Sequence, residues 1–259
     1  MVGPVQCAGP GQTAQLFDAV PCAETAAKKR GFLKLLEATL RNARRSGLIK
    51  DSTANCAIDS TGYEAGHTSS YYGKRCGLKK SRYPKLTTVC DLRSYLYLSA
   101  IADSGPKPDD IEFHRAVREA FKLQPFKRLL ADAGYDSEKH HRYLREFLGV
   151  RSVIPPTRGR PTQKLPRQKY RRRMATHFPR TTYGKRWHIE SSFSQDKRRF
   201  GSQISAQTYW SQCRELYLRV LVHNIALIWR FFYLLNRAVA SPLSLYRSTQ
   251  EWHSVVHRH

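Results

Sequence analysis

Four polar side chains lie along one segment at intervals that a helix would bring to the same side. Tyr183, Arg186, Glu190 and Lys197 stand at offsets 0, 3, 7 and 14 from the tyrosine. At about 100° per residue, these offsets fall within a stripe about 60° wide. A single carboxylate among cations and a tyrosine suits the binding of a metal ion and a phosphodiester. A solvated helix with an Arg186–Glu190 ion pair would give the same spacing.

Two aspartates favour the chemical interpretation, because each of them follows an apolar run. Asp59 ends the run that begins at Ala57, and Asp132 ends the run that begins at Leu129. Open α/β sheets build their sites where strands emerge into turns. The carboxylates of Asp59, Asp132 and Glu190 would then form a cage for two Mg²⁺ or Mn²⁺ ions, which need several converging oxygen ligands.

Each aspartate has an alternative nearby in the sequence. Asp91 also follows a predicted strand and is the alternative to Asp59, which we prefer for the Ser-Thr-Gly that follows it. Asp136 is the alternative to Asp132, although an aspartate at that position is also a typical helix cap.

The chain is strongly basic, and the basic residues are concentrated. Its 259 residues include 45 Lys and Arg against 20 Asp and Glu, which gives a net charge of +25. No acid lies between Phe147 and Ile189, where Lys and Arg number 12. A surface with this charge repels itself unless a polyanion binds it, and nucleic acid is the first candidate. Arg171, Arg172 and Arg173 are predicted to contact phosphates.

Composition and patterning exclude several other classes of protein. Hydrophobic residues make up 41% of the chain, which is too many for a wholly disordered basic tail. Six scattered cysteines include no C-x-x-C pair, so we expect neither a zinc ribbon nor a disulfide scaffold. The apolar run 216–235 contains Arg219, His223, Asn224 and Arg230, so it is predicted to be a buried helix and not a membrane span.

The order of the predicted elements indicates an α/β domain with a mixed sheet of about five strands flanked by helices. We expect Asp59 and Asp132 to emerge from adjacent strands, and Glu190 to lie on a helix that packs through Ile189 and Phe193. The predicted helices span 24–47, 108–122, 137–148, 183–200 and 215–235, the last of them in the core. The predicted strands span 54–60, 68–74, 85–91, 94–102, 126–131 and 151–154.

Together these motifs resemble those of the bacterial insertion-sequence transposases of the DDE class, which have a ribonuclease-H-like catalytic domain. The resemblance rests on a Tyr-x2-Arg-x3-Glu-x6-Lys signature at 183–197, on Asp-Ser-Thr-Gly at Asp59 and on Ala-Asp-x-Gly-Tyr-Asp at Asp132. It covers residues 55–235, and the His223-Asn224 pair is similar to the segment that follows the signature in this group.

The resemblance implies a site and a reaction. Asp59, Asp132 and Glu190 would hold two Mg²⁺ or Mn²⁺ ions, and Tyr183, Arg186 and Lys197 would hold phosphates of the transposon end. The reaction would be hydrolytic nicking at the element's ends, followed by attack of the freed 3′-hydroxyl on target DNA. The partners would be double-stranded DNA and a second copy of the chain, in the bacterial cytoplasm at the nucleoid.

Composition, helical spacing and the resemblance together predict a domain organisation. We expect a loose leader over 1–23, a basic amphipathic helix over 24–50, the catalytic domain over 51–240 and a tail over 241–259. A basic insertion over 155–182 would precede the last catalytic helix and contact DNA.

Two other functions remain open at this level. Family members usually have a fuller region before the first aspartate, so the chain could be a truncated or domesticated copy that only binds DNA. A basic RNA-binding protein of the ribosomal type is a weaker alternative, because such proteins need no acids at three separate sites.

Overall fold

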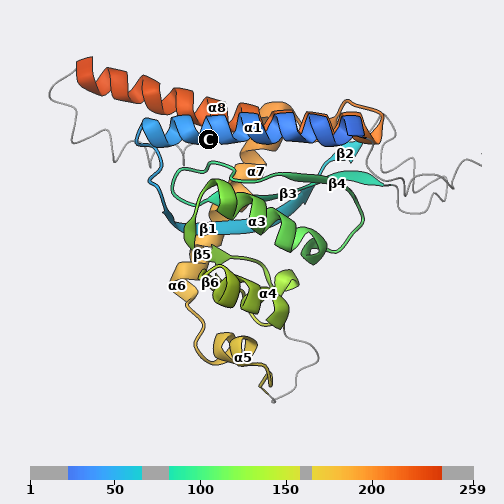
Figure 1. Ribbon diagram of the computed structural model, residues 1–259, viewed down its shortest axis with the longest axis vertical. Coiled ribbons are helices and arrows are strands. Elements are labelled where there is room, and N and C mark those ends of the chain that lie inside the picture. Colours follow the sequence, from blue (N-terminus) through green and yellow to red (C-terminus); the bar gives the residue numbers. More distant parts are fainter. Residues whose placement is uncertain (1–22, 66–81, 158–164, 241–259) are drawn as a thin grey trace, which may run out of the picture.

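The computed structural model describes residues 23–65, 82–157 and 165–240. These residues form a mixed five-stranded sheet flanked by helices, which confirms the predicted fold class (Figure 1). The strand order is β4-β3-β1-β5-β6. The strands of this sheet are β1 (Thr53–Gly62), β3 (Tyr83–Asp91), β4 (Ile101–Gly105), β5 (Phe126–Leu130) and β6 (Arg151–Val153). Two short strands, β2 (Glu64–Ala65) and β7 (Gln203–Ile204), pair with each other.

Strand β1 lies at the centre of the sheet, antiparallel to β3 and parallel to β5. Its residues Cys56, Ala57 and Ile58 are completely buried. A strand that is covered on both faces buries consecutive residues, which explains why this run is apolar without alternation. The part of β1 just before Asp59 is therefore fixed by its two neighbouring strands and by burial on both faces.

Helices surround the sheet. In Figure 1, α1 and α8 run side by side along the top of the molecule, and α5 lies at the opposite end. The long helices are α1 (Ala23–Arg45), α3 (Phe113–Leu123), α7 (Trp187–Phe200) and α8 (Tyr209–Ala240). The shorter helices and turns are η1 (Asp109–Glu112), η2 (Ala133–Tyr135), α4 (Glu138–Arg142), η3 (Tyr143–Phe147), α5 (Lys169–Thr176), α6 (Arg180–Tyr183) and η4 (Gly184–Arg186).

Helix α1 is part of the same core as the sheet. Its residues Phe32, Leu36, Leu40 and Ala43 recur at helical spacing and are buried. The ring of Phe32 stacks on that of Tyr217 in α8, with 4.4 Å between the ring centroids. The helix predicted over 24–47 therefore packs against α8 through one apolar stripe.

The strand predicted over 94–102 is wrong for most of its length, because β4 begins only at Ile101. Ser94 donates its backbone N–H and its hydroxyl to Oδ2 of Asp91, which closes a turn directly after β3. Tyr95 then adopts a left-handed backbone with φ 64°. The residues before Ile101 are nevertheless buried, so their apolar sequence resembles that of a strand.

Two predicted helices are present but are less regular than expected. The helix predicted over 108–122 is the 3₁₀ turn η1 followed by α3, and the helix predicted over 137–148 is α4 followed by the π-helical turn η3. The strand predicted over 68–74 and the tail over 241–259 lie outside the described residues, as does the predicted leader before Ala23.

Helix α8 was predicted to lie in the core, and this prediction is correct for only one of its sides. Leu216, Val220 and Leu227 are buried against the sheet and α1. On the other side Leu218 and Trp229 are 59% and 68% exposed. An apolar helix whose two sides are both hydrophobic gives no sequence signal for which side faces solvent.

By length and composition alone, Tyr209–Arg237 of α8 could cross a membrane, and core helices of soluble proteins also meet that criterion. Arg219 on this helix is buried and donates to the backbone carbonyls of Gly201 and Gln203, at 2.6 and 2.5 Å. The same helix packs against β3 and β4. These contacts are those of a helix that belongs to the folded domain.

Substitution of Gly201 is expected to destabilise the protein, because this residue ends α7 with φ 82° and ψ 153°. That combination is essentially accessible only to glycine, so we expect Gly201→Ala to cost about 1–3 kcal/mol of unfolding free energy. Gly184→Ala is the matched control, because Gly184 has helical φ −53° and its added Cβ would meet nothing within 4 Å. The control is expected to be neutral or stabilising in urea unfolding. Equal effects of the two substitutions would contradict the prediction.

Candidate active site

The first two predicted acids belong to adjacent parallel strands, Asp59 within β1 and Asp132 just after β5. The register of β1 and β5 pairs Ala57 with Leu130, and Asp59 and Asp132 each lie two residues further along. Asp59 is not at a strand end, because β1 continues to Gly62, whereas Asp132 is the second residue after β5. The two side chains therefore start from the same level of the sheet.

Arg186 links the first acid to the third. Its Nη1 donates to Oδ2 of Asp59 at 3.1 Å, and its Nη2 donates to Oε1 of Glu190. The Arg186 and Asp59 side chains are 16% and 18% exposed, so this pair is largely shielded from solvent. Two carboxylates that lie 131 residues apart in the chain thus share one cationic group.

Burial and neighbouring charges shift the pKa values of Asp59 and Arg186 in opposite directions. Burial raises the pKa of Asp59 above its ordinary value, although the N–H of Ser60 and the Arg186 guanidinium act against it. Burial alone would lower the pKa of Arg186, but the carboxylates of Asp59 and Glu190 raise it overall. The site therefore needs a cation next to Asp59 to keep that carboxyl ionised.

Asp132 belongs to the same electrostatic neighbourhood. Its carboxylate contributes to the raised pKa of Arg186 and, after burial, to that of Tyr183. Its Oδ1 accepts from the N–H of Ala133, which fixes the side chain at the start of the turn η2. Asp132 thus acts electrostatically on Arg186 and Tyr183, and its own hydrogen bond is to the turn that it begins.

The signature residues lie on one nearly continuous helical segment formed by α6, η4 and α7. Tyr183 ends α6 and packs its ring edge-on against Phe178, with 5.0 Å between the ring centroids. Ile189 and Phe193 of α7 are buried in the core, as predicted. This apolar side fixes the rotation of α7 and so directs Glu190 toward β1.

Lys197 lies further along α7 and faces a different neighbour. Its Nζ is 5.3 Å from the centroid of the Tyr63 ring, and Cζ of Arg219 is 5.3 Å from the same centroid. Burial lowers the pKa of Lys197, while the charge of Glu64 raises it. Tyr63 directly follows β1, so it connects the strand that carries Asp59 to both cations. Tyr63 is not predicted from the sequence, because a lone tyrosine after a strand is common.

The three predicted arginines of the basic insertion differ in their surroundings. Arg171 donates from Nε and Nη2 to Oδ2 of Asp136, at 2.9 and 2.7 Å. The backbone N–H groups of Tyr170 and Arg171 donate to Glu138, so this acid caps the first turn of α5. Arg172 and Arg173 are exposed on α5. The structure thus uses Arg171 to hold α5 against the domain, while the next two arginines face outward.

Asp136 has structural contacts instead of contacts to the three acids. Burial alone would raise its pKa, but His141, Arg171 and the N–H of Thr157 hold the pKa at about 2. This observation favours Asp132 over Asp136 as the second acid.

The lowered pKa of Asp136 leads to a pH prediction. The ordinary aspartate pKa is about 3.9. The ionised form therefore stabilises the fold above about pH 4, and this contribution is lost as the pH falls toward 2. Asp136→Asn should lower the urea midpoint at pH 7, with a difference from wild type that closes between pH 4 and pH 2. Asp51→Asn, at an exposed position, is the control. A difference that stays constant with pH would show that the ionised carboxylate is not the cause.

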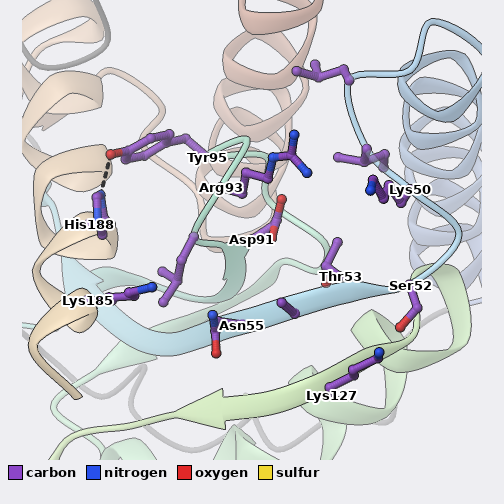
Figure 2. A pocket seen from close by; sticks show the side chains of 14 residues that line it. Lys50, Ser52, Thr53, Asn55, Asp91, Arg93, Tyr95, Lys127, Lys185 and His188 are labelled. Atoms are coloured by element: carbon purple, nitrogen blue, oxygen red, sulfur yellow. Dashed lines mark hydrogen bonds between the residues drawn. The ribbon is translucent and has the colours of Figure 1, made fainter. Parts of the chain in front are cut away.

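Asp91, the alternative to Asp59, lies in a different place. The register pairs it with Cys56, three residues before Asp59 and thus about 10 Å away along the strand. It is 1% exposed and lies beside a pocket near the beginning of β1 (Figure 2). Neither Arg186 nor Glu190 contacts it among the interactions of the described residues.

A buried polar network joins α7 to α8, and sequence reasoning did not find it. Asp196 accepts from the hydroxyl of Tyr97 at 2.7 Å, and its Oδ1 is 2.6 Å from Nδ1 of His223. Asn224 bonds to both backbone groups of Tyr97, at 2.9 Å each. The sequence analysis identifies the His223-Asn224 pair. It does not predict Asp196 as a partner, because Asp196 is one of several charged residues within the signature segment.

Comparison with known families agrees with this arrangement. The sequence matches the family described as "Transposase DDE domain" over residues 53–225, which is more than half of the chain. The chain belongs to this family. The comparison with curated proteins finds no match. The matched range begins with β1 and ends within α8, so it contains the sheet, all three acids and the complete signature.

Membership in a transposase DDE family implies transposition as the biological process, DNA as the partner and a soluble protein. Members of the family generally use divalent metal ions. The chemistry of the donors fits such an ion, because Asp59 and Glu190 are carboxylates that already share one cationic group. As they stand, no three His, Cys, Asp or Glu side chains in the described ranges are close enough to hold an ion.

Proposed function

We propose that this protein is a bacterial insertion-sequence transposase that cleaves DNA at the ends of its element and joins those ends to target DNA. One observation carries the proposal. Arg186 joins Asp59 of the central strand to Glu190 of α7, at the level of the sheet where Asp132 follows the neighbouring strand. Phosphodiester cleavage and strand transfer need such a convergence of acids beside basic groups that can hold phosphates.

The chain's own side chains have distinct roles in this proposal. Asp59, Asp132 and Glu190 would hold two Mg²⁺ or Mn²⁺ ions, which when bound activate a nucleophile and stabilise the charge of in-line displacement. Arg186 neutralises the carboxylates before DNA arrives and then turns to a phosphate of the element's end. The Tyr183 hydroxyl lies on the same side of the helical segment and would bond a second phosphate oxygen.

Asp59, Asp132 and Glu190 are called the acid cluster below. Basic groups outside this cluster would position the duplex. Lys197 would contact a phosphate further from the cleaved bond, since it lies about two turns of α7 beyond Glu190. Arg172 and Arg173 would contact the backbone from α5, with Arg171 retained as the residue that fixes this helix. Because an element has two ends, we propose that the protein acts as a homodimer on DNA, in the bacterial cytoplasm.

The proposal is tested with a duplex that carries the inverted repeats flanking the coding sequence. With Mn²⁺ present, the wild-type protein is expected to produce a nick with a free 3′-hydroxyl at the repeat, and a chelator is expected to abolish it. A failure to nick under conditions in which a matched active relative nicks would contradict the proposal. Tight binding of the same duplex without nicking would instead identify a DNA-binding protein that has lost catalysis.

A further inference from the structure

A pocket of about 500 Å³ is lined by residues of β1 and of the helical segment formed by α6, η4 and α7 (Figure 2). Its walls are the connection from α1 to β1, the loop after β3, the start of β5 and the beginning of the helical segment, where Lys185 and His188 line it. At 100° per residue, His188 is about 160° around the helix from Glu190. The pocket and the acid cluster therefore use opposite sides of one helix.

Strand β1 also separates the two places. Thr53 and Asn55 line the pocket, and they precede Asp59 by six and four residues. At about 3.3 Å per residue, the pocket is roughly 13–20 Å from the Asp59 position along the strand. A ligand in the pocket would not touch the three acids.

The pocket is rich in cations, and of these only Arg93 has a carboxylate, that of Asp91, close to it. Lys50, Arg93, Lys127 and Lys185 line it from four different segments, and all four are exposed. Within the described ranges, none of them forms an ion pair with an acid, whereas Arg171, Arg186 and Arg219 elsewhere all do. Unpaired cations that converge on a concave surface attract an anion, because each of them keeps its full charge.

Asp91 is the one acid among the residues that line the pocket, so the lining has a net positive charge. The side chain points toward Arg93 (Figure 2). Its Oδ2 accepts two hydrogen bonds from Ser94, while its Oδ1 is buried and has no hydrogen-bond partner. Burial raises the pKa of Asp91, although Ser94 and Arg93 act against this shift. The lining thus contains one carboxyl and four cations.

The loop that forms this wall is held in a costly conformation. Tyr95 has a positive φ of 64°, which is uncommon for a residue other than glycine. Its hydroxyl bonds to Nδ1 of His188, its N–H donates to the carbonyl of Asp91 at 2.9 Å, and its carbonyl is 2.9 Å from Nε2 of His223. Strain that is fixed by several contacts is typical of preformed sites.

We propose that this pocket binds the phosphodiester backbone of a DNA strand and is a second DNA contact, separate from the acid cluster. The inference rests on the proposed function, since it takes its strand from the DNA on which the protein acts. Lys50, Arg93, Lys127 and Lys185 contact successive phosphates, and the volume lies within the range of pockets that enclose a ligand the size of a nucleotide.

The test compares two double variants with the same change of charge. Arg93→Ala with Lys127→Ala removes two cations from the pocket. Arg118→Ala with Lys122→Ala removes two exposed, unpaired cations from α3 and serves as the control. The affinity for a short single-stranded oligonucleotide is measured by fluorescence anisotropy over a range of salt concentrations, without a metal ion.

The pocket variant is expected to lose roughly tenfold in affinity for each lost phosphate contact at 0.1 M salt, and its log–log salt slope should become shallower by about 1.4. An affinity and slope equal to those of the control variant would overturn the proposal. Tight binding of dAMP or inorganic phosphate, with oligonucleotide affinity unchanged in the pocket variant, would show a small-molecule site and would also overturn it.

This readout does not depend on cleavage. A wild-type protein that fails to nick but loses oligonucleotide affinity in the pocket variant would contradict the proposed function and support the pocket. A wild-type protein that nicks, combined with unchanged oligonucleotide affinity in the pocket variant, would support the proposed function and contradict the proposal for the pocket.

Discussion

The variants Asp59→Asn, Asp132→Asn and Glu190→Gln are each expected to lower the rate of DNA cleavage at least about a hundredfold. A bound metal ion contributes several kcal/mol to stabilising the charge of the transition state, and each 1.4 kcal/mol is a factor of ten in rate. An amide retains the shape of the side chain but removes the negative charge that holds the ion. The measurement is the single-turnover rate of nicking with saturating duplex.

The fold is expected to survive these three changes. Burial raises the pKa of Asp59, so the ionised form is disfavoured in the native state and a neutral amide avoids that cost. We expect thermal midpoints within about 4 °C of wild type, which for a domain of this size corresponds to about 1–2 kcal/mol. Glu37→Gln, an exposed glutamate on α1, is the matched control and should nick like wild type. Retention of full activity by any one of the three variants would remove that residue from the acid cluster.

Replacing Asp196 by alanine is expected to give the largest loss of stability, about 3–5 kcal/mol. Asp196 is 2% exposed and bonds to both Tyr97 and His223, which are themselves buried. Its removal leaves the Tyr97 hydroxyl and Nδ1 of His223 without this hydrogen-bond partner, and each buried polar group left unpaired costs about 1–3 kcal/mol. Asp196→Asn keeps an acceptor for the Tyr97 hydroxyl and should lose less.

Urea unfolding measures this effect through the midpoint at an unchanged slope. Asp110→Ala removes an exposed acid near the start of α3, and it should stay within about 0.5 kcal/mol of wild type. A loss for Asp196→Ala no greater than that of the control would show that the network between α7 and α8 contributes little. Because α7 also carries Glu190, we expect the alanine variant to lose nicking activity in parallel with its stability.

The sequence predicted the α/β fold class and the adjacency of Asp59 and Asp132 because both follow from local pattern. Apolar runs that end on an acid mark buried strands, and Ile189 with Phe193 mark the side of a helix that faces the core. The predictions were wrong where tertiary contacts, and not the local sequence, determine whether a residue is in a strand or faces solvent. The loop 94–100 is buried like a strand, and the two sides of α8 are equally apolar although only one meets the core.

In the acid cluster, too, local spacing predicted some contacts and missed those that depend on the tertiary structure. Helical spacing placed Arg186 and Glu190 on one side, but only the three-dimensional arrangement shows that Arg186 also reaches Asp59. Spacing likewise grouped Arg171 with two neighbours that turn out to face solvent, because its partner Asp136 lies 35 residues away. Long-range pairs of this kind have no signature in a single sequence.

The double contact of Arg186 has a consequence for how copies of such a gene degrade. The flat fork of a guanidinium reaches two acids at once, whereas the ammonium of lysine is a single point of charge on a flexible stem. An Arg186→Lys change preserves the charge and would be classed as conservative in an alignment of diverging copies. In this geometry the lysine leaves either Asp59 or Glu190 without its counter-ion, so a lysine at this position marks a damaged copy.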